Sequence, residues 1–275
     1  MLVNLAEILA LTKDKKAAVP AFNCYNMETV MGVTAAAEEA NAPVVVQGYS
    51  RLFDSDNGYY LAAIALAAAK KATVPVCVHL DHGAGLPEVM RALHWGCTGV
   101  MLDRSNLPLE ENIAASKEAC ELCAHAGVPM EGELGHIGAA KDGVSTEHTK
   151  VDEAVRFVKE TGVAALAVLV GTAHGRYKQA PVLNIKRIQE ISEATGLPLV
   201  LHGGSGVPDE QIQASIDAGI KKINFGTDLC YSFLDEVFNT SRDLVAVDLF
   251  MKEPVNAVKK FALEKIRLLR ADSIL

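Results

Sequence analysis

Short apolar runs recur along the chain, separated by longer segments in which apolar residues return every three or four positions. The runs are continuously apolar rather than alternating, which is the pattern of parallel strands that are buried on both faces. They predict strands at residues 18–22, 43–47, 74–80, 99–102, 129–134, 164–169, 198–201 and 222–224.

The segments between these runs have the periodicity of helices. Glycine often comes just before the next strand, as at Gly127, Gly196 and Gly219, where it suits the end of a helix. We expect helices at residues 27–41, 58–72, 86–95, 109–126, 151–161, 184–195, 208–218 and 228–240. Eight strands, each followed by a helix, are the count for an α/β fold of the TIM (β/α)8 barrel type.

An open, doubly wound sheet is the alternative architecture, but no G-x-G-x-x-G follows the first predicted strand. No linker interrupts the pattern, so residues 1–275 are expected to form a single domain. A further helix is predicted at residues 251–270, on the barrel exterior or in a subunit contact. The polar, glycine-bearing connection at residues 135–150 has the length of a mobile active-site loop.

The charge and the apolar runs exclude some partners. A net charge of −8 argues against nucleic-acid binding, which needs clustered lysine and arginine. It is compatible with an anionic small substrate, because backbone amides at helix N-termini bind phosphate. The longest apolar runs, at 61–69 and 163–170, are too short to span a membrane, and the first residues do not resemble a targeting segment.

The 6 cysteines are too sparse for a disulfide framework in a chain of 275 residues. We expect reduced thiols in a cytoplasmic protein. Cys120 and Cys123 form a C-x-x-C inside a helical pattern, without a second pair. We interpret them as two core residues on one helix face.

Histidines follow three of the predicted strands. His82, His174 and His202 each lie at a strand end and are each followed by glycine. Any one of them alone is more often a hydrogen-bonded structural residue. Because the carboxyl ends of barrel strands meet at one mouth, the three together predict a catalytic zinc site with three nitrogen ligands and an open position.

Asp81 precedes the first of these histidines and is the predicted general acid/base, because a carboxylate beside a metal-bound substrate can move a hydroxyl proton. The alternative role for Asp81 is to hold a ligand imidazole. His79, on the same strand, is a candidate to orient Asp81 or a ligand.

Two glycine-bearing loops predict a phosphate site. The first, at residues 202–206, reads H-G-G-S-G and leads into a helix, so that its backbone amides, Ser205 and the helix terminus favour an anion. The second, N-F-G-T at residues 224–227, follows the eighth predicted strand. TIM barrels often bind phosphate with the loops after strands seven and eight.

Together these motifs resemble the class II fructose-bisphosphate and tagatose-bisphosphate aldolases over nearly the whole chain. The likeness rests on P-A-F-N at residues 20–23, H-L-D-H-G at 79–83, G-T-A-H-G-x-Y-K at 171–178, H-G-G-S-G at 202–206 and K-I-N at 222–224, in that order.

The resemblance implies a TIM barrel that cleaves a ketose phosphate into dihydroxyacetone phosphate and an aldehyde. It assigns one Zn²⁺ to His82, His174 and His202, and the hydroxyl proton to Asp81. In this family zinc chelates the dihydroxyacetone-phosphate half and stabilises its enediolate. The residues that match the family's contacts to this half and its phosphate are Asn23, Gly175, Lys178, Gly203, Gly204, Ser205, Asn224, Phe225, Gly226 and Thr227.

The resemblance also implies features beyond this site. Asp103, Ser105 and Glu133 match positions near a second, non-catalytic or resting metal position. A monovalent cation often lies beside the phosphate loops of the family. Its members are usually dimers or tetramers, so a homodimer or homotetramer is expected.

Three positions depart from the family pattern. Lys141 stands where the mobile loop usually carries a glutamate that exchanges the enediolate proton, and Tyr49 stands where a serine or threonine usually follows the second strand. Gly226 stands where fructose-bisphosphate enzymes often have an aspartate and tagatose enzymes a small residue. These departures leave the metal chemistry intact and put the ordinary sugar substrate in question, with Tyr49 and Lys141 as candidate loop acid/base or specificity residues.

Several functions remain open. The leading prediction is an aldolase for fructose or tagatose bisphosphate, and its variant is an aldolase for another anionic ketose phosphate, such as a sulfonated fructose phosphate. A metal-dependent sugar-phosphate epimerase on the same barrel is the alternative from another enzyme class. A sugar-phosphate-binding sensor is the non-enzyme alternative, and the presence of Asp81 with three histidines argues against it.

Overall fold

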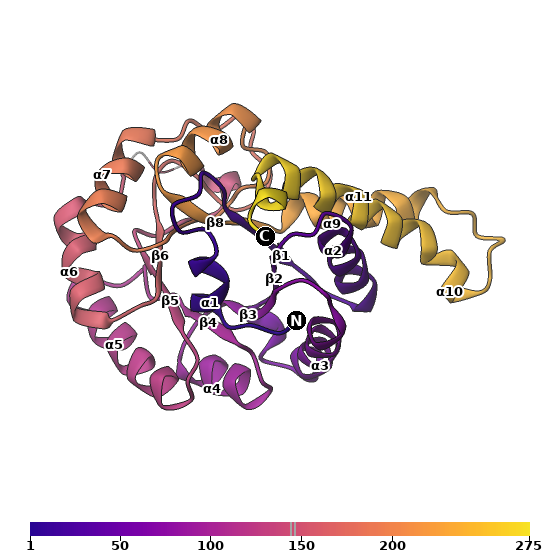
Figure 1. The fold of residues 1–275 in the computed structure, drawn as a ribbon, viewed down its shortest axis with the longest axis horizontal. Coiled ribbons are helices and arrows are strands. Elements are labelled where there is room, and N and C mark those ends of the chain that lie inside the picture. Colours follow the sequence, from indigo (N-terminus) through magenta and orange to yellow (C-terminus); the bar gives the residue numbers. More distant parts are fainter. Residues whose placement is uncertain (144, 146) are drawn as a thin grey trace.

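The computed structural model describes residues 1–143, 145 and 147–275. Its centre is a closed barrel in which each strand pairs in parallel with the next and β8 pairs with β1 (Figure 1). The TIM barrel predicted from the sequence is therefore confirmed. The strands are β1 (Val19–Asn23), β2 (Val44–Tyr49), β3 (Val76–Gly83), β4 (Gly99–Leu102), β5 (Met130–Leu134), β6 (Ala165–Val168), β7 (Leu199–Leu201) and β8 (Ile220–Phe225).

A helix follows each strand and covers the outside of the barrel. Each predicted helix and strand overlaps an observed one. The barrel helices are α2 (Met27–Glu39), α3 (Asp56–Lys71), α4 (Leu86–His94), α5 (Leu109–His125), α6 (Val151–Thr161), α7 (Ile185–Thr195), α8 (Asp209–Asp217) and α9 (Thr227–Asn239). Short 3-10 turns η1 (Ser50–Leu52), η2 (Ala140–Asp142) and η3 (Ala271–Ser273) were not predicted.

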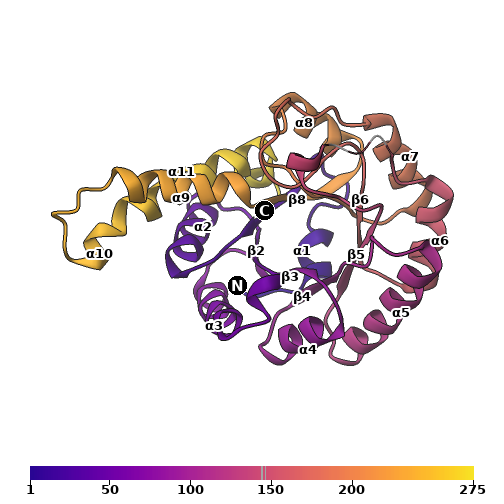
Figure 2. The same cartoon turned by 180° about the vertical axis from the view of Figure 1, so that it is seen from behind.

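The sequence pattern also missed α1 (Leu5–Ala10), which has too few residues to reveal a period. A capping box between Asn4 and Glu7 begins it, and it buries Leu5 against the strands. The backbone N–H of Leu5 donates to the Thr98 carbonyl, just before β4, so α1 covers the amino-terminal end of the barrel. Figure 2 shows the molecule from behind, with α1 inside the ring of strands.

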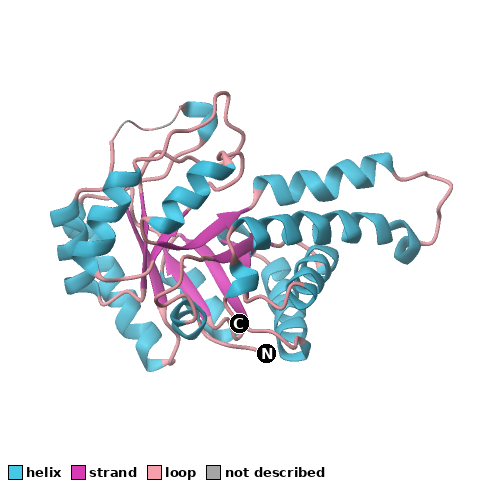
Figure 3. Cartoon of the chain, turned by 45° about the horizontal axis from the view of Figure 1, so that its top comes forward, coloured by secondary structure: helices cyan, strands magenta, loops and turns pink. Residues whose placement is uncertain are grey.

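The predicted C-terminal helix is α11 (Lys252–Leu268), which packs against α2 and α9. Its amino-terminal half and the end of α9 project beyond the barrel as an arm, with α10 (Val247–Phe250) at the tip (Figure 3). Val258 and Ile266 of α11 are fully buried. This helix therefore belongs to the barrel exterior along one part of its length and leaves the barrel along the other.

All 6 cysteines are free thiols, and Cys120 and Cys123 lie on α5, as expected. Within the described residues, no helix is long and apolar enough to cross a membrane.

Candidate active site

The three predicted histidines come together at the carboxyl end of the barrel. His82 is at the end of β3, His174 lies in the loop after β6, and His202 follows β7. The rings of His82 and His174 are 4.8 Å apart between centroids, and those of His82 and His202 are 4.5 Å apart. One ring nitrogen from each of the three histidines lies within 4.8 Å of the other two, which is close enough for a single metal ion to bind all three.

Each of these rings uses its other nitrogen to bind the protein. His82 Nδ1 is 2.8 Å from Asp103 Oδ2, His174 Nδ1 is 3.0 Å from the Ile137 carbonyl oxygen, and His202 Nε2 is 2.8 Å from Glu131 Oε1. Such acceptors fix the tautomer and orientation of metal-binding imidazoles. The nitrogens left for a metal are therefore Nε2 of His82 and His174 and Nδ1 of His202.

A bulge at the end of β3 lets two consecutive residues face the site. Neighbouring side chains on a regular strand point to opposite faces. Here the register with β4 shifts between Leu80 and Gly83, and His82 has a left-handed backbone with φ of 54°. A Cβ on Gly83 would lie 2.5 Å from the Met101 carbonyl oxygen. This local geometry brings His82 Nε2 to 3.9 Å from Asp81 Oδ1.

His174 is held by the loop that follows β5. The backbone N–H of His174 donates to the Gly138 carbonyl, and Ala140 N–H donates back to the His174 carbonyl. The hydroxyl of Tyr177 ties the same loop to the next one, because it lies 2.7 Å from the Ala173 carbonyl oxygen and 2.9 Å from that of Gly203. The G-T-A-H-G-x-Y-K motif thus carries one metal-facing residue and one residue that holds its loop.

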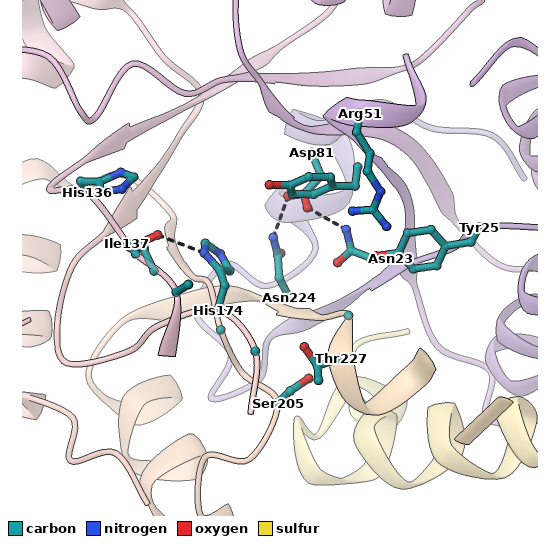
Figure 4. Close-up of a pocket in the computed structure, with 16 residues that line it drawn as sticks. Asn23, Tyr25, Arg51, Asp81, His136, Ile137, His174, Ser205, Asn224 and Thr227 are labelled. Carbon is teal, nitrogen blue, oxygen red and sulfur yellow. Dashed lines mark hydrogen bonds between the residues drawn. The ribbon is translucent and has the colours of Figure 1, made fainter. Parts of the chain in front are cut away.

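Two asparagines grip the carboxylate of Asp81. The side-chain amide of Asn23 donates to Asp81 Oδ2 at 2.7 Å, and that of Asn224 donates to Oδ1 at 3.0 Å (Figure 4). Gln47 in turn donates to Asn23, and Lys222 donates to Asn224. The family resemblance implies that Asn23 and Asn224 bind the substrate, and the geometry adds that both orient Asp81.

A buried ion pair, which sequence reasoning missed, supports this arrangement from inside the barrel. Lys222 and Glu131 are both fully buried, and Lys222 Nζ lies 2.9 Å from Glu131 Oε2. Glu131 accepts from His202 with its other oxygen, while Lys222 also reaches Asn224. One buried lysine therefore connects the partner of a metal-facing histidine to the partner of Asp81. His79, fully buried on β3, lies 3.6 Å from Glu131 rather than at the site itself.

The charges around the histidines set different protonation states. Burial lowers the pKa of His82, but Asp81, Asp103 and Glu133 outweigh it and raise that pKa to about 10. Burial and the nearby charge of His82 lower the pKa of His174 to about 4 and hold the pKa of His202 well below its usual range. At neutral pH His174 and His202 are therefore ready to bind a metal, whereas His82 must first lose a proton.

The residues predicted for a second metal position lie behind His82. Ser105 Oγ is 2.7 Å from Asp103 Oδ1 and 2.9 Å from Glu133 Oε1. Burial and the adjacent Asp103 raise the pKa of Glu133 to about 8. His82, Asp103 and Glu133 form a second group of metal-binding size that shares His82 with the first.

A cavity of about 380 Å³ opens over these groups, and its volume lies in the range of small-molecule sites. Asp81 and His174 face it, together with the two glycine-bearing loops (Figure 4). From the predicted set its lining includes Asn23, Tyr49, Gly175, Gly203, Ser205, Asn224, Gly226 and Thr227.

The glycines of the H-G-G-S-G loop allow it to pack closely against the neighbouring loop and strand. A Cβ on Gly203 would lie 2.3 Å from the Ala173 carbonyl oxygen, and one on Gly204 would lie 2.7 Å from Ile223. Ser205 Oγ accepts from the backbone N–H of Asp228 in the first turn of α9, which binds the loops to each other. Ser205 and the start of α9 therefore border the same part of the cavity.

Some predicted residues are not brought to the cavity. Lys141 and Lys178 are exposed and line a neighbouring pocket instead. Phe225 is fully buried and stacks on Phe22, so its side chain belongs to the core, and Gly204 is buried as well. Conversely, Tyr25, Arg51 and His136 line the cavity although the sequence did not single them out. Their only sequence signal was a place soon after a predicted strand.

Comparisons with known proteins identify the family of this chain. The family model described as class II fructose-bisphosphate aldolase matches residues 3–273. The chain belongs to this family. It is therefore an aldolase, a carbon–carbon lyase, as the resemblance implied, and these findings give the epimerase alternative no support.

Relatives of this aldolase are named for different substrates. It is 34% identical over 273 residues to a 6-phospho-5-dehydro-2-deoxy-D-gluconate aldolase of Bacillus licheniformis, covering 96% of this chain and 94% of the relative. It is 39% identical over 222 residues to a sulfofructosephosphate aldolase of Alkalicoccus urumqiensis, covering 79% and 77%. The crystal structure of the YdjI aldolase from Escherichia coli K12 superposes with a TM-score of 0.90 at 35% identity, covering 99% and 98%.

Proposed function

We propose that this aldolase binds one catalytic zinc ion between His82, His174 and His202 and cleaves a ketose phosphate to dihydroxyacetone phosphate and an acid-bearing aldehyde. The observation that carries the proposal is the set of acceptors on the outer nitrogens of all three rings. It leaves three nitrogens facing one another beside the cavity, which is the donor set of catalytic zinc sites.

Zinc, when bound there, would supply a Lewis acid for the substrate carbonyl. The donors suit it, because three neutral imidazoles leave an open position for substrate oxygen. Asp103, Ser105 and Glu133 are proposed as a second metal position, supported by the group that two of them form with His82. A monovalent cation beside the phosphate loops stays a prediction from the family.

Asp81 is the proposed proton acceptor in cleavage. Its carboxylate takes the proton of the hydroxyl on the carbon that becomes the aldehyde. The carbon–carbon bond then breaks, and its electron pair stays on the ketone half as an enediolate. A proton added to that carbon gives dihydroxyacetone phosphate. The two amides that grip Asp81 aim its oxygens into the cavity and limit its reorientation.

The phosphate of the ketone half is proposed to bind at Gly175, Gly203, Ser205, Gly226 and Thr227. Gly226 is the residue before α9 and Thr227 is its first residue, so backbone amides and the helix dipole favour an anion there. Lys178 lies outside this group, in the lining of the neighbouring pocket, so its contact with the phosphate stays a prediction from the family.

We further propose that the aldehyde half differs from that of the ordinary fructose-bisphosphate enzymes. The enzyme has Lys141, rather than a carboxylate, at the loop position, and Gly226, whose Cβ would lie 3.2 Å from Asn23 Oδ1. Burial and Asp81 raise the pKa of Tyr49, so at neutral pH its phenol is a proton donor at the cavity wall. Fructose or tagatose bisphosphate is the alternative substrate.

A substrate panel with metal control tests this function. Zinc-loaded protein would be offered fructose bisphosphate, tagatose bisphosphate, a sulfonated fructose phosphate and 6-phospho-5-dehydro-2-deoxy-D-gluconate, and released dihydroxyacetone phosphate would be measured. We expect release from at least one ketose, its loss on chelation and its return with zinc. Release from none of them, or full turnover after chelation, would refute the proposal. A highest kcat/KM for fructose bisphosphate, unchanged in Lys141→Ala, would refute the altered aldehyde half alone.

A homodimer or homotetramer is proposed from the arm. Phe238 on α9 is 81% exposed, and Val245 and Val247 beside the tip are 84% and 68% exposed. Apolar side chains gathered on one projection are typical of a surface that another copy covers. Light scattering of the purified protein gives the mass, and a monomer at micromolar concentration would contradict this proposal.

A further inference from the structure

The structure places Arg51 in the lining of the cavity beside the histidines. It lies in η1, directly after β2, and therefore at the carboxyl end of the barrel where the chemistry is. Arg51 lines the cavity with Asp81 and His174, and it also lines the adjoining pocket beside Asp103 and Arg104. It stands at the boundary between the two, exposed to solvent.

Two aromatic rings hold the guanidinium group in place. Its central carbon lies 5.3 Å from the ring centroid of Tyr25 and 5.1 Å from that of Tyr49. Tyr25 belongs to the loop after β1, and Tyr49 ends β2, so the rings come from neighbouring strands. Stacking on aromatic faces orients a guanidinium without using its N–H donors in the ring plane.

Within the described part of the chain, no carboxylate forms an ion pair with Arg51, in contrast to Arg91, Arg156, Arg187 and Arg270. The acidic groups around it are already engaged. Asp81 accepts from two asparagines, Asp103 from His82 and Ser105, and Asp54 pairs with Arg91. Among the described residues, the N–H donors of Arg51 are therefore not paired with a carboxylate, so they can bind an acid group of the substrate.

The position of Arg51 relative to Asp81 indicates which half of the substrate Arg51 faces. In Figure 4 Arg51 lies above the two asparagines, and Ser205 and Thr227 of the phosphate loops lie below them. Asp81 must face the carbon that becomes the aldehyde, so the remainder of the aldehyde half extends away from the phosphate loops. Arg51 lies in the cavity lining on that side and carries a positive charge.

We propose that Arg51 is the specificity residue for the aldehyde half and binds an acid group at its far end. This inference rests on the proposed aldolase function and deepens it. A planar guanidinium matches carboxylate, sulfonate and phosphate oxygens with paired N–H donors, so one residue serves any of these three acids. Arg51, which lines the cavity, is therefore assigned to bind this acid in place of Lys141, which lines the neighbouring pocket.

The test compares two substrates in two proteins. Wild type and Arg51→Met would be assayed with the acid-bearing ketose that wild type uses best and with fructose 1-phosphate, which ends in a hydroxyl. We expect Arg51→Met to lower kcat/KM for the acid-bearing ketose by about ten- to a hundredfold, chiefly through KM, the scale of hydrogen bonds to a charged group. Cleavage of fructose 1-phosphate, followed at high enzyme concentration, should change less than about twofold on the same reasoning.

Two further variants sharpen the result. Arg51→Lys keeps the charge and loses the paired donors, so it should recover part of the lost kcat/KM. Arg267→Met removes an exposed arginine from α11, outside the cavity lining, and should leave both substrates unaffected. Zinc content and circular dichroism of Arg51→Met would establish that the variant is folded and loaded.

An equal loss for both substrates would overturn the proposal, because Arg51 would then support the site in general. No loss for either substrate would overturn it as well. Failure of the aldolase function itself is distinguishable, since wild type would then release no dihydroxyacetone phosphate from any ketose.

Discussion

The half of the cavity around the histidines and the half around Arg51 are stabilised in different ways. In the first, which we call the chemical half, His82, His202 and Asp81 are buried, and each is fixed by hydrogen bonds to residues on or just after other strands. In the second, the outer half, Tyr25, Tyr49, Arg51 and His136 are half-buried or exposed, and stacking holds the arginine. A rigid network suits a reaction that the family shares, whereas an exposed rim can change with the substrate.

The largest expected effect is the loss of a histidine from the chemical half. His174→Ala should lose zinc and activity together, because two nitrogen ligands hold the ion poorly. His136→Ala removes a histidine of the outer half and is the matched control, in which zinc should stay. Metal analysis after dialysis, paired with the cleavage assay, measures both. Full turnover by His174→Ala would remove the histidine from the metal site.

Asp81→Ala should separate chemistry from binding. Zinc and substrate should still bind, while kcat falls on the order of a hundredfold or more, the usual scale for a lost general acid/base. Single-turnover kinetics on the zinc-loaded variant would measure the cleavage step. Near-normal cleavage would leave Asp81 with a structural role only.

Lys222→Met tests the buried connection that Lys222 makes between Glu131, the partner of His202, and Asn224, the partner of Asp81. It leaves Glu131 buried without its cation, which destabilises the fold and loosens the imidazole of His202. We expect zinc affinity to fall by about ten- to a hundredfold, the scale for residues that orient metal ligands. Lys221→Met is the control, because Lys221 Nζ donates to the Lys15 carbonyl, at the other end of the barrel from the site. Equal zinc affinity in both variants would refute the connection.

A smaller expected effect is the release of a proton from His82 when zinc binds. His82, with its pKa raised to about 10, is protonated in the metal-free protein at pH 7.5, whereas His174 and His202 are neutral. Zinc binds only neutral imidazole, so about one proton from His82 should be released per zinc bound. Zinc affinity should rise with pH up to about 10 and then level off. A pH-indicator titration in weak buffer measures this, and uptake of protons would contradict it.

The difference between the halves also explains what the sequence reveals. The barrel follows from apolar runs and helical periods, and the three histidines follow from their shared place at strand ends. Lys222 and Glu131 escape such reasoning, because a charged residue inside a strand gives no sign of its partner across the barrel. Arg51 escapes it for another reason. Its meaning depends on two rings from different strands, and only the folded chain brings them together.

The central claim is that the chemical half carries out the reaction, while Arg51 of the outer half binds only the aldehyde half. The most direct test of this claim uses dihydroxyacetone phosphate alone, without any aldehyde. In deuterium oxide, the chemical half should exchange one carbon-bound hydrogen of this compound, and nuclear magnetic resonance follows the exchange. We predict that zinc-loaded wild type and Arg51→Met exchange it at equal rates, and that chelation abolishes exchange in both. No exchange by zinc-loaded wild type, or a loss in Arg51→Met as large as its loss of cleavage, would contradict the account.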